Sequence, residues 1–119
     1  MKKYDFQKAK AIIAKLGGDI VTASLGMNED AFWTMETVYE NGKYTRELNE
    51  GDEIAGISGS SWATPVLEVE LKDGRTEVYA CFSGESLGSI RKDFSSSLGC
   101  LSGPCQVERE GVEIKEFAL

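Results

Sequence analysis

Two dipeptides constrain the fold of this 119-residue chain more than any other feature of its sequence. Asn41-Gly42 and Asp73-Gly74 each lie between two runs that are rich in aromatic and β-branched residues. Such dipeptides readily adopt the positive φ angles that a two-residue β-hairpin turn requires. The sequence therefore predicts two antiparallel hairpins, one within residues 32–48 and one within residues 66–82.

An amphipathic helix is expected before the first hairpin. Asp5 is a suitable N-cap, apolar residues follow at helical spacing as far as Leu16, and Gly17-Gly18 supplies a stop signal. We therefore expect the helix to span residues 6–16. Further strands are expected at residues 20–25, where Gly26 ends the strand, and at residues 54–57; a short helix is expected from Ser86, and a last hairpin over residues 106–117.

These elements predict an α+β fold. We expect an antiparallel sheet of about six or seven strands built from hairpins, with the N-terminal helix packed on one face. A small half-open barrel is the alternative. A chain of 119 residues is typical of one domain, so residues 1–119 are expected to form a single compact unit.

The charge balance limits the classes of partner. The chain has 20 acidic and 13 basic residues, a formal net charge of −7. Binding to nucleic acid needs clustered Lys and Arg, and the basic residues here are scattered, so we expect no direct nucleic-acid contact. An acidic protein can instead bind the basic surface of a nucleic-acid-binding protein. With no long apolar run and three sparse cysteines, the chain is expected in the cytoplasm, without a membrane partner.

Pairing across a two-residue turn is fixed by the turn, so the residues that face each other can be counted. In the first hairpin, Tyr39 is expected opposite Tyr44, and Glu36 opposite Glu47. Each facing pair of like charges is mildly destabilising, which suggests a purpose other than folding.

The same counting applies to the second hairpin. Leu71 is expected opposite Thr76, and Glu70 opposite Glu77. The two facing carboxylate pairs, with Glu68 beside them, form a candidate acidic, partner-binding stripe. Its members are Glu36, Glu47, Glu68, Glu70 and Glu77. Three interpretations are open: solvated strand faces, a surface for a basic protein, or oxygen ligands for a divalent cation.

The stretch from Gly56 to Pro65 is a second candidate site. Gly59, Ser60 and Ser61 offer backbone N–H groups and hydroxyls to a phosphate, and Trp62 offers a ring on which a base can stack. The stretch lacks the lysine and the spacing of a phosphate-binding P-loop. The alternative is a tight connection in which Trp62 fills the core, and we favour this alternative.

Catalysis is not expected. The chain has no histidine, which excludes Ser–His–Asp and Cys–His mechanisms and any His-ligated metal. Cys81, Cys100 and Cys105 supply at most three thiolates, one fewer than a structural zinc site of cysteines needs, and Cys81 is expected to be a packed thiol. We expect a non-enzymatic protein with no cofactor and no metal.

In size, acidity, absence of histidine and crowding of the five glutamates named above, the chain resembles the small acidic proteins with which phages and prophages block bacterial immunity, anti-CRISPR proteins among them. This resemblance implies stoichiometric inhibition in the bacterial cytoplasm, by occupying a nucleic-acid groove or by sequestering a nucleotide signal. The first hypothesis is therefore an inhibitor that binds a basic, nucleic-acid-binding effector. The alternatives are a nucleotide sponge or sensor that uses the Trp62 loop, and a structural phage protein.

Overall fold

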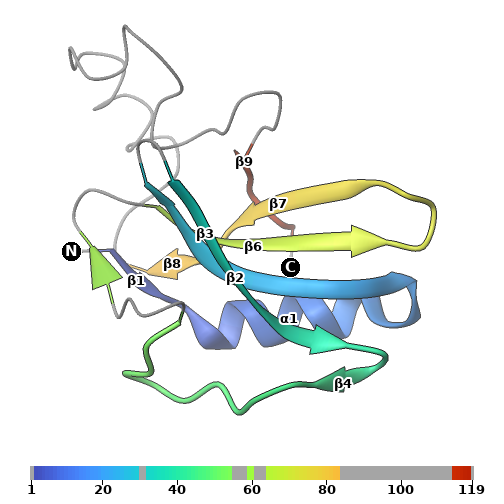
Figure 1. Ribbon diagram of the computed structural model, residues 1–119, viewed down its shortest axis with the longest axis horizontal. Coiled ribbons are helices and arrows are strands. Elements are labelled where there is room, and N and C mark those ends of the chain that lie inside the picture. The colour runs from blue at the N-terminus through green and yellow to red at the C-terminus, as the bar shows by residue number, and fades with distance from the viewer. Residues whose placement is uncertain (1, 30–31, 55–58, 61–63, 84–113, 119) are drawn as a thin grey trace, which may run out of the picture.

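The computed structural model describes residues 2–29, 32–54, 59–60, 64–83 and 114–118. Within these residues the fold is α+β, with an N-terminal helix and a mostly antiparallel six-stranded sheet (Figure 1). The elements in chain order are β1 (Lys2–Tyr4), α1 (Phe6–Leu16), a 3-10 turn η1 (Gly17–Asp19), β2 (Ile20–Glu29), β3 (Phe32–Glu40), β4 (Lys43–Tyr44), β5 (Gly59–Ser60), β6 (Thr64–Leu71), β7 (Thr76–Ala80), β8 (Phe82–Ser83) and β9 (Ile114–Lys115).

The strands among the described residues form two sheets. The large sheet has the order β4-β3-β2-β6-β7-β9, and a small sheet has the order β5-β1-β8. The expected fold class is confirmed in kind, with two differences. The pair β7–β9 is parallel, whereas an antiparallel sheet was expected, and β1 adds a strand before the helix. Parallel neighbours come from distant segments of a chain, so local turn signals do not reveal them.

Helix α1 begins and ends at the residues that the sequence indicates. The Asp5 side chain accepts a hydrogen bond from the backbone N–H of Lys8 at 3.0 Å, which satisfies one of the donors left open at a helix start. At the other end Gly17 has a φ of 52°, a left-handed conformation that glycine adopts easily. The predicted helix over residues 6–16 is confirmed.

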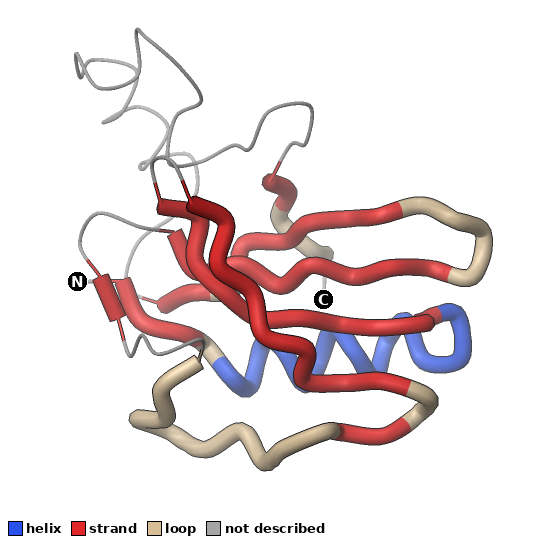
Figure 2. The backbone as a smooth tube through the Cα atoms, viewed as in Figure 1, coloured by secondary structure: helices blue, strands red, loops and turns tan. Residues whose placement is uncertain are grey.

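The main core lies between α1 and one face of the large sheet (Figure 2). The helix contributes Phe6, Ala9, Ile12 and Ile13, all buried. The sheet contributes buried residues from β2, β3 and β6, and two residues of the segment after β4 join them; these are Ile20, Ala23, Leu25, Val38, Leu67, Val69, Leu71, Leu48 and Ile54. This arrangement buries the apolar stripe of the helix against the apolar face of the sheet.

Strand β2 is longer than predicted. It continues through Gly26 to Glu29, because Gly26 pairs with Met35 on one side and Val66 on the other. A glycine between two neighbouring strands keeps its backbone in the ladder and does not end the strand. The register shifts between Ile20 and Thr22, which leaves Val21 as an extra residue and brings Ile20 into the core.

The first hairpin confirms the predicted turn but not the predicted length. Asn41 and Gly42 have φ angles of 55° and 78°, and Tyr39 pairs with Tyr44. The rings of these two tyrosines meet edge to face at 5.2 Å between centroids. Strand β4, however, ends at Tyr44, where a return as far as Leu48 was expected.

The second hairpin differs from the prediction by one residue. The Leu71 N–H donates to the Arg75 carbonyl, and the Gly74 N–H donates to the Leu71 carbonyl, both at 2.9 Å. The loop therefore has three residues, with Gly74 at a φ of 90°. An Asp-Gly sequence suits this loop as well as a two-residue turn, because both place glycine at positive φ.

The one-residue shift changes every pair in the second hairpin. Glu70 pairs with Thr76, and Val69 pairs with Glu77. The expected pairs Leu71–Thr76 and Glu70–Glu77 were therefore wrong. Shifting a register by one residue also moves a side chain to the other face of the sheet, so Glu70 and Glu77 lie on opposite faces.

Several expectations lie outside the described residues. They include the strand at residues 55–57, the short helix from Ser86, the first part of the last hairpin, and the positions of Cys100 and Cys105. Of that hairpin, only residues 114–118 are described, and there β9 pairs with β7. Across the described part of the chain, no helix is both long and apolar enough to cross a membrane.

Candidate functional site

The large sheet has two faces with different surroundings. We call the face that packs against α1 the inner face and the opposite one the outer face (Figure 2). Residues that pair directly share a face, and successive residues of a strand alternate between the faces. The observed register therefore assigns a face to each strand glutamate of the predicted stripe, and the stripe does not lie on a single face.

Glu36 lies on the inner face, opposite Leu25. It does not face Glu47, which the sequence had predicted. Instead, its Oε2 lies 2.9 Å from a guanidinium nitrogen of Arg46, and Arg46 also donates to the Glu53 carbonyl at 3.0 Å. The hydrogen bond with Glu36 raises the pKa of Arg46 above its ordinary value, against the lowering effect of burial. Arg46 thus connects β3 with the Glu53 carbonyl, at the point where the chain leaves the hairpin.

Glu77 also lies on the inner face, opposite Val69. Its carboxylate is 2.8 Å from the Lys115 ammonium and 3.5 Å from the Arg75 guanidinium. Two basic groups therefore compensate this charge within the molecule. Glu36 and Glu77 contribute to the local structure and are poor candidates for recognition of a basic partner.

Glu68 and Glu70 lie on the outer face, two residues apart on β6. Across the strand pair, Glu68 is opposite Ser24 and Glu70 is opposite Thr22. The Thr22 hydroxyl donates to Glu70 Oε2 at 3.5 Å, longer than the usual range of about 2.5–3.0 Å for such bonds. This carboxylate is therefore held only weakly by its neighbour.

The two glutamates belong to a larger group that we call the outer polar face. Its members are Thr22, Ser24, Thr37, Glu40, Lys43, Glu68, Glu70 and Thr76, placed together by the pairing of β4, β3, β2, β6 and β7. Three carboxylates and one ammonium give it an acidic balance. Four other described residues of the outer face are apolar and buried; these are Val66, Val78, Ala80 and Ile114.

The second candidate site is only partly described. Gly59 and Ser60 form β5, which is hydrogen-bonded to β1, with Lys3 opposite Gly59 and Lys2 opposite Ser60. Part of the backbone that was expected to meet a phosphate therefore belongs to a sheet. Ser61 and Trp62 lie outside the described residues, so the interpretation of Trp62 as a core residue stays a prediction.

Cys81 is a packed thiol, as predicted. The residue is fully buried, and its Sγ donates to the Asp5 carbonyl at 3.2 Å. Burial, assisted by the negative charge of Asp5, raises the pKa of the Cys81 thiol to about 12. The thiolate is the nucleophilic form of cysteine, so this group is unsuited to catalysis.

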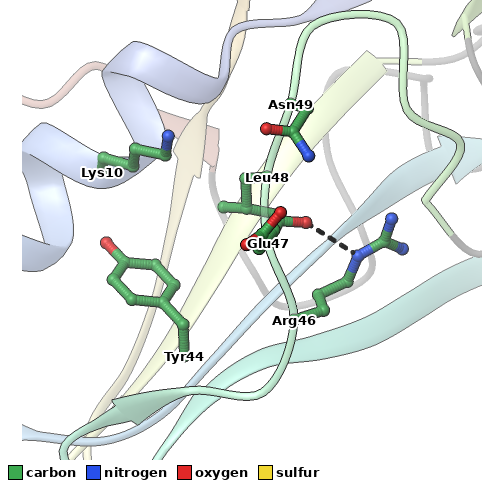
Figure 3. A pocket seen from close by; sticks show the side chains of 6 residues that line it. All are labelled: Lys10, Tyr44, Arg46, Glu47, Leu48 and Asn49. Atoms are coloured by element: carbon green, nitrogen blue, oxygen red, sulfur yellow. Dashed lines mark hydrogen bonds between the residues drawn. The ribbon is translucent and has the colours of Figure 1, made fainter.

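Glu47 lies in neither sheet; it lines a pocket between α1 and the segment after β4 (Figure 3). The pocket has a volume of 420 Å³ and is lined by Lys10, Tyr44, Arg46, Glu47, Leu48 and Asn49. Burial and the neighbouring Tyr39 raise the pKa of Tyr44 above its ordinary value. Sequence reasoning missed this pocket because residues 44–48 read as a strand, and no motif connects them with Lys10.

Across the described residues, no group of three His, Cys, Asp or Glu side chains is placed to hold a metal ion. The chain was also compared with protein-family models, curated proteins and solved structures, and none of these comparisons found a match.

Proposed function

We propose that this protein is a non-catalytic binding protein that docks its outer polar face onto a basic surface of another protein. The observation that carries the proposal is the separation of the five glutamates. Glu36 and Glu77 pair with basic groups on the inner face, and Glu47 lines a pocket. Glu68 and Glu70 lie two residues apart on the outer polar face, whose named members include three carboxylates and one ammonium.

The outer polar face has properties that favour docking. Glu70 makes only a long contact with Thr22, and the Ser24 and Thr37 hydroxyls lie 3.4 Å apart. Groups held this weakly can exchange their internal contacts for hydrogen bonds to a partner without losing much. Carboxylates next to hydroxyls suit arginine and lysine side chains, since ionised partners make the stronger hydrogen bonds.

The net charge supports the same class of partner. At −7 the molecule repels nucleic acid and attracts surfaces that bind nucleic acid. Together with the resemblance to small acidic anti-defence proteins, this leads us to propose a nucleic-acid-binding effector of bacterial defence as the partner. Inhibition is then stoichiometric, because the protein occupies the surface that would hold phosphates.

The proposal is tested by affinity capture from a bacterial lysate followed by mass spectrometry. Captured proteins are expected to be basic, and their affinity is expected to fall steeply between about 50 and about 500 mM salt, because screening weakens charge attraction. Purified DNA or RNA added with the partner is expected to compete with the protein. A specific partner whose affinity is independent of salt, or which binds nucleic acid and this protein at the same time, would contradict the proposal.

A further inference from the structure

We propose that the pocket between α1 and residues 44–49 binds a small zwitterion, a molecule with one ammonium and one carboxylate such as an apolar amino acid or a dipeptide. This site lies on the helix side of the sheet and is separate from the outer polar face. The proposal is independent of the docking function.

The pocket has two opposite charges that are not paired with each other. Lys10 projects from α1, and Glu47 comes from the segment that follows β4 (Figure 3). Within the described part of the chain, neither the Lys10 ammonium nor the Glu47 carboxylate has a hydrogen-bond or ion-pair partner. A ligand carboxylate can therefore meet Lys10 while a ligand ammonium meets Glu47.

The remaining lining residues determine which kind of side chain a bound zwitterion can have. Tyr44 and Leu48 both line the pocket; Tyr44 is 44% exposed and offers apolar ring surface to a ligand side chain, whereas Leu48 is largely buried beside it. The Tyr44 hydroxyl and the Asn49 amide add uncharged polar groups at the pocket wall. This mixture of apolar surface and a few polar groups is typical of small-molecule sites.

The wall of the pocket is held in place before any ligand arrives. In Figure 3 the Arg46 guanidinium points away from Lys10. It bonds Glu36, and it also donates to the carbonyls of Glu47 and Glu53. The Asn49 N–H donates to an Asp52 carboxylate oxygen at 2.9 Å. Such preorganisation lowers the entropic cost of binding.

Charge and size together select the ligand class. A nucleotide would place several negative charges beside Glu47, with Lys10 as the available cation, because Arg46 is already paired. The volume of 420 Å³ lies in the lower part of the range of about 300–1,000 Å³ for ligand pockets. A free amino acid or a dipeptide satisfies both conditions.

The test is an NMR titration of the ¹⁵N-labelled protein with L-phenylalanine, L-leucine and the dipeptide Phe-Leu, up to about 10 mM, which detects millimolar dissociation constants. We expect saturable shifts at Lys10 and at residues 44–49. Two analogues each lack one charge: N-acetylphenylalanine has no ammonium, and phenylalanine amide has no carboxylate. Both are expected to bind at least about tenfold more weakly than phenylalanine.

Variants connect each charge with its residue. Glu47→Gln is expected to abolish the preference for phenylalanine over N-acetylphenylalanine. Lys10→Gln is expected to abolish the preference for phenylalanine over phenylalanine amide. Lys15→Gln on the same helix and Glu50→Gln in the same segment lie outside the pocket and are expected to keep both preferences. The proposal is overturned if none of the three zwitterions gives saturable shifts, if the single-charge analogues bind equally well, or if the pocket variants keep both preferences.

Discussion

Arg46 is the residue that determines the path of the chain after the first hairpin. Its guanidinium contacts Glu36 of β3 on one side, and Asp52 and the Glu53 carbonyl on the other. Arg46 thereby joins β3 to residues 52–53. Arginine suits this role because its planar group presents several donors in fixed directions. Leu48 lies between Arg46 and residues 52–53, Ile54 follows them, and both enter the core.

Replacing Arg46 is therefore expected to destabilise the fold. Hydrogen bonds to charged groups contribute about 1.5–3 kcal/mol. Glu36 is partly exposed, and solvent screening reduces the contribution of its ion pair with Arg46. We therefore expect Arg46→Ala to lower the free energy of unfolding by about 1–2 kcal/mol. Urea melts measure this change. Arg46→Lys keeps the positive charge but lacks the planar guanidinium with its several donors. Its free energy of unfolding is expected to lie between those of wild type and Arg46→Ala. As a control, Arg75→Ala removes an exposed arginine and is expected to leave the urea midpoint unchanged; an equal loss in both alanine variants would argue against the role of Arg46.

The Cys81 thiol makes stability depend on alkaline pH. Its pKa is about 12 in the folded protein, against an ordinary value of 9.0. Above pH 9 the unfolded chain releases this proton while the folded chain retains it, so the unfolded state gains free energy of ionisation. The stability contributed by the protonated thiol is complete below pH 9 and is lost as the pH rises towards 12.

Two measurements follow from the buried thiol. Cys81→Ala is expected to lose less stability than the wild type between pH 9 and pH 11, as measured by urea melts at each pH. At pH 8 iodoacetamide is expected to leave Cys81 unmodified in the folded protein and to modify it in urea, as read by peptide mass spectrometry. Equal modification with and without urea would show that the thiol is accessible.

At the level of elements, the two hairpins show what a turn dipeptide determines. Asn41-Gly42 forms the expected two-residue turn, with both residues at positive φ. In the second hairpin Gly74 is at positive φ while Asp73 accepts a hydrogen bond from the Arg75 N–H at 3.0 Å. The aspartate thus stabilises the three-residue loop, and the register of this loop separates Glu70 from Glu77.

Gly74 is expected to be sensitive to substitution for the same reason. A side chain at a φ of 90° is strained even though no atom lies within 4 Å of its Cβ, so Gly74→Ala is expected to cost about 1–2 kcal/mol of stability. Gly18 has equally open surroundings and no positive φ, so Gly18→Ala is the matched control, with no loss expected. Urea melts of both variants compare them. An equal loss of stability in the two variants would mean that the positive φ of Gly74 is not the cause of its sensitivity.

The parts of the fold that the sequence predicts correctly depend on contacts between near neighbours. Asp5 and Gly17 bound the helix, and Asn41-Gly42 sets the Tyr39–Tyr44 pair. The parts that it misses depend on distant partners. Examples are the guanidinium that ends β4 early and the parallel pairing of β9 with β7.

The candidate sites follow the same division. The sequence identifies Glu68 and Glu70 as surface carboxylates, but it cannot assign faces without the correct register. The pocket needs Lys10 of the helix and Glu47 of a distant segment, and only the packing of α1 brings them together.

At the scale of the whole molecule, charge is separated between the two faces of the sheet. On the inner face, short ion pairs join Glu36 to Arg46 and Glu77 to Lys115. A further ion pair of 2.8 Å joins Lys8 of α1 to Glu116 next to β9. On the outer polar face the carboxylates outnumber the basic groups. We therefore expect a basic partner to contact the carboxylates of the outer polar face.

The most direct test compares partner binding by two variants with the same net charge. Glu68→Gln/Glu70→Gln and Glu36→Gln/Glu77→Gln each remove two of the seven excess negative charges, so both change the net charge from −7 to −5. The dissociation constant of each variant is measured against the partner captured by the wild type. We expect the outer-face variant to bind at least about tenfold more weakly than wild type. We expect the inner-face variant to bind within about twofold of wild type and to show the greater loss of stability. Equal weakening in the two variants would mean that net charge, and not the outer polar face, is recognised, and would contradict the account.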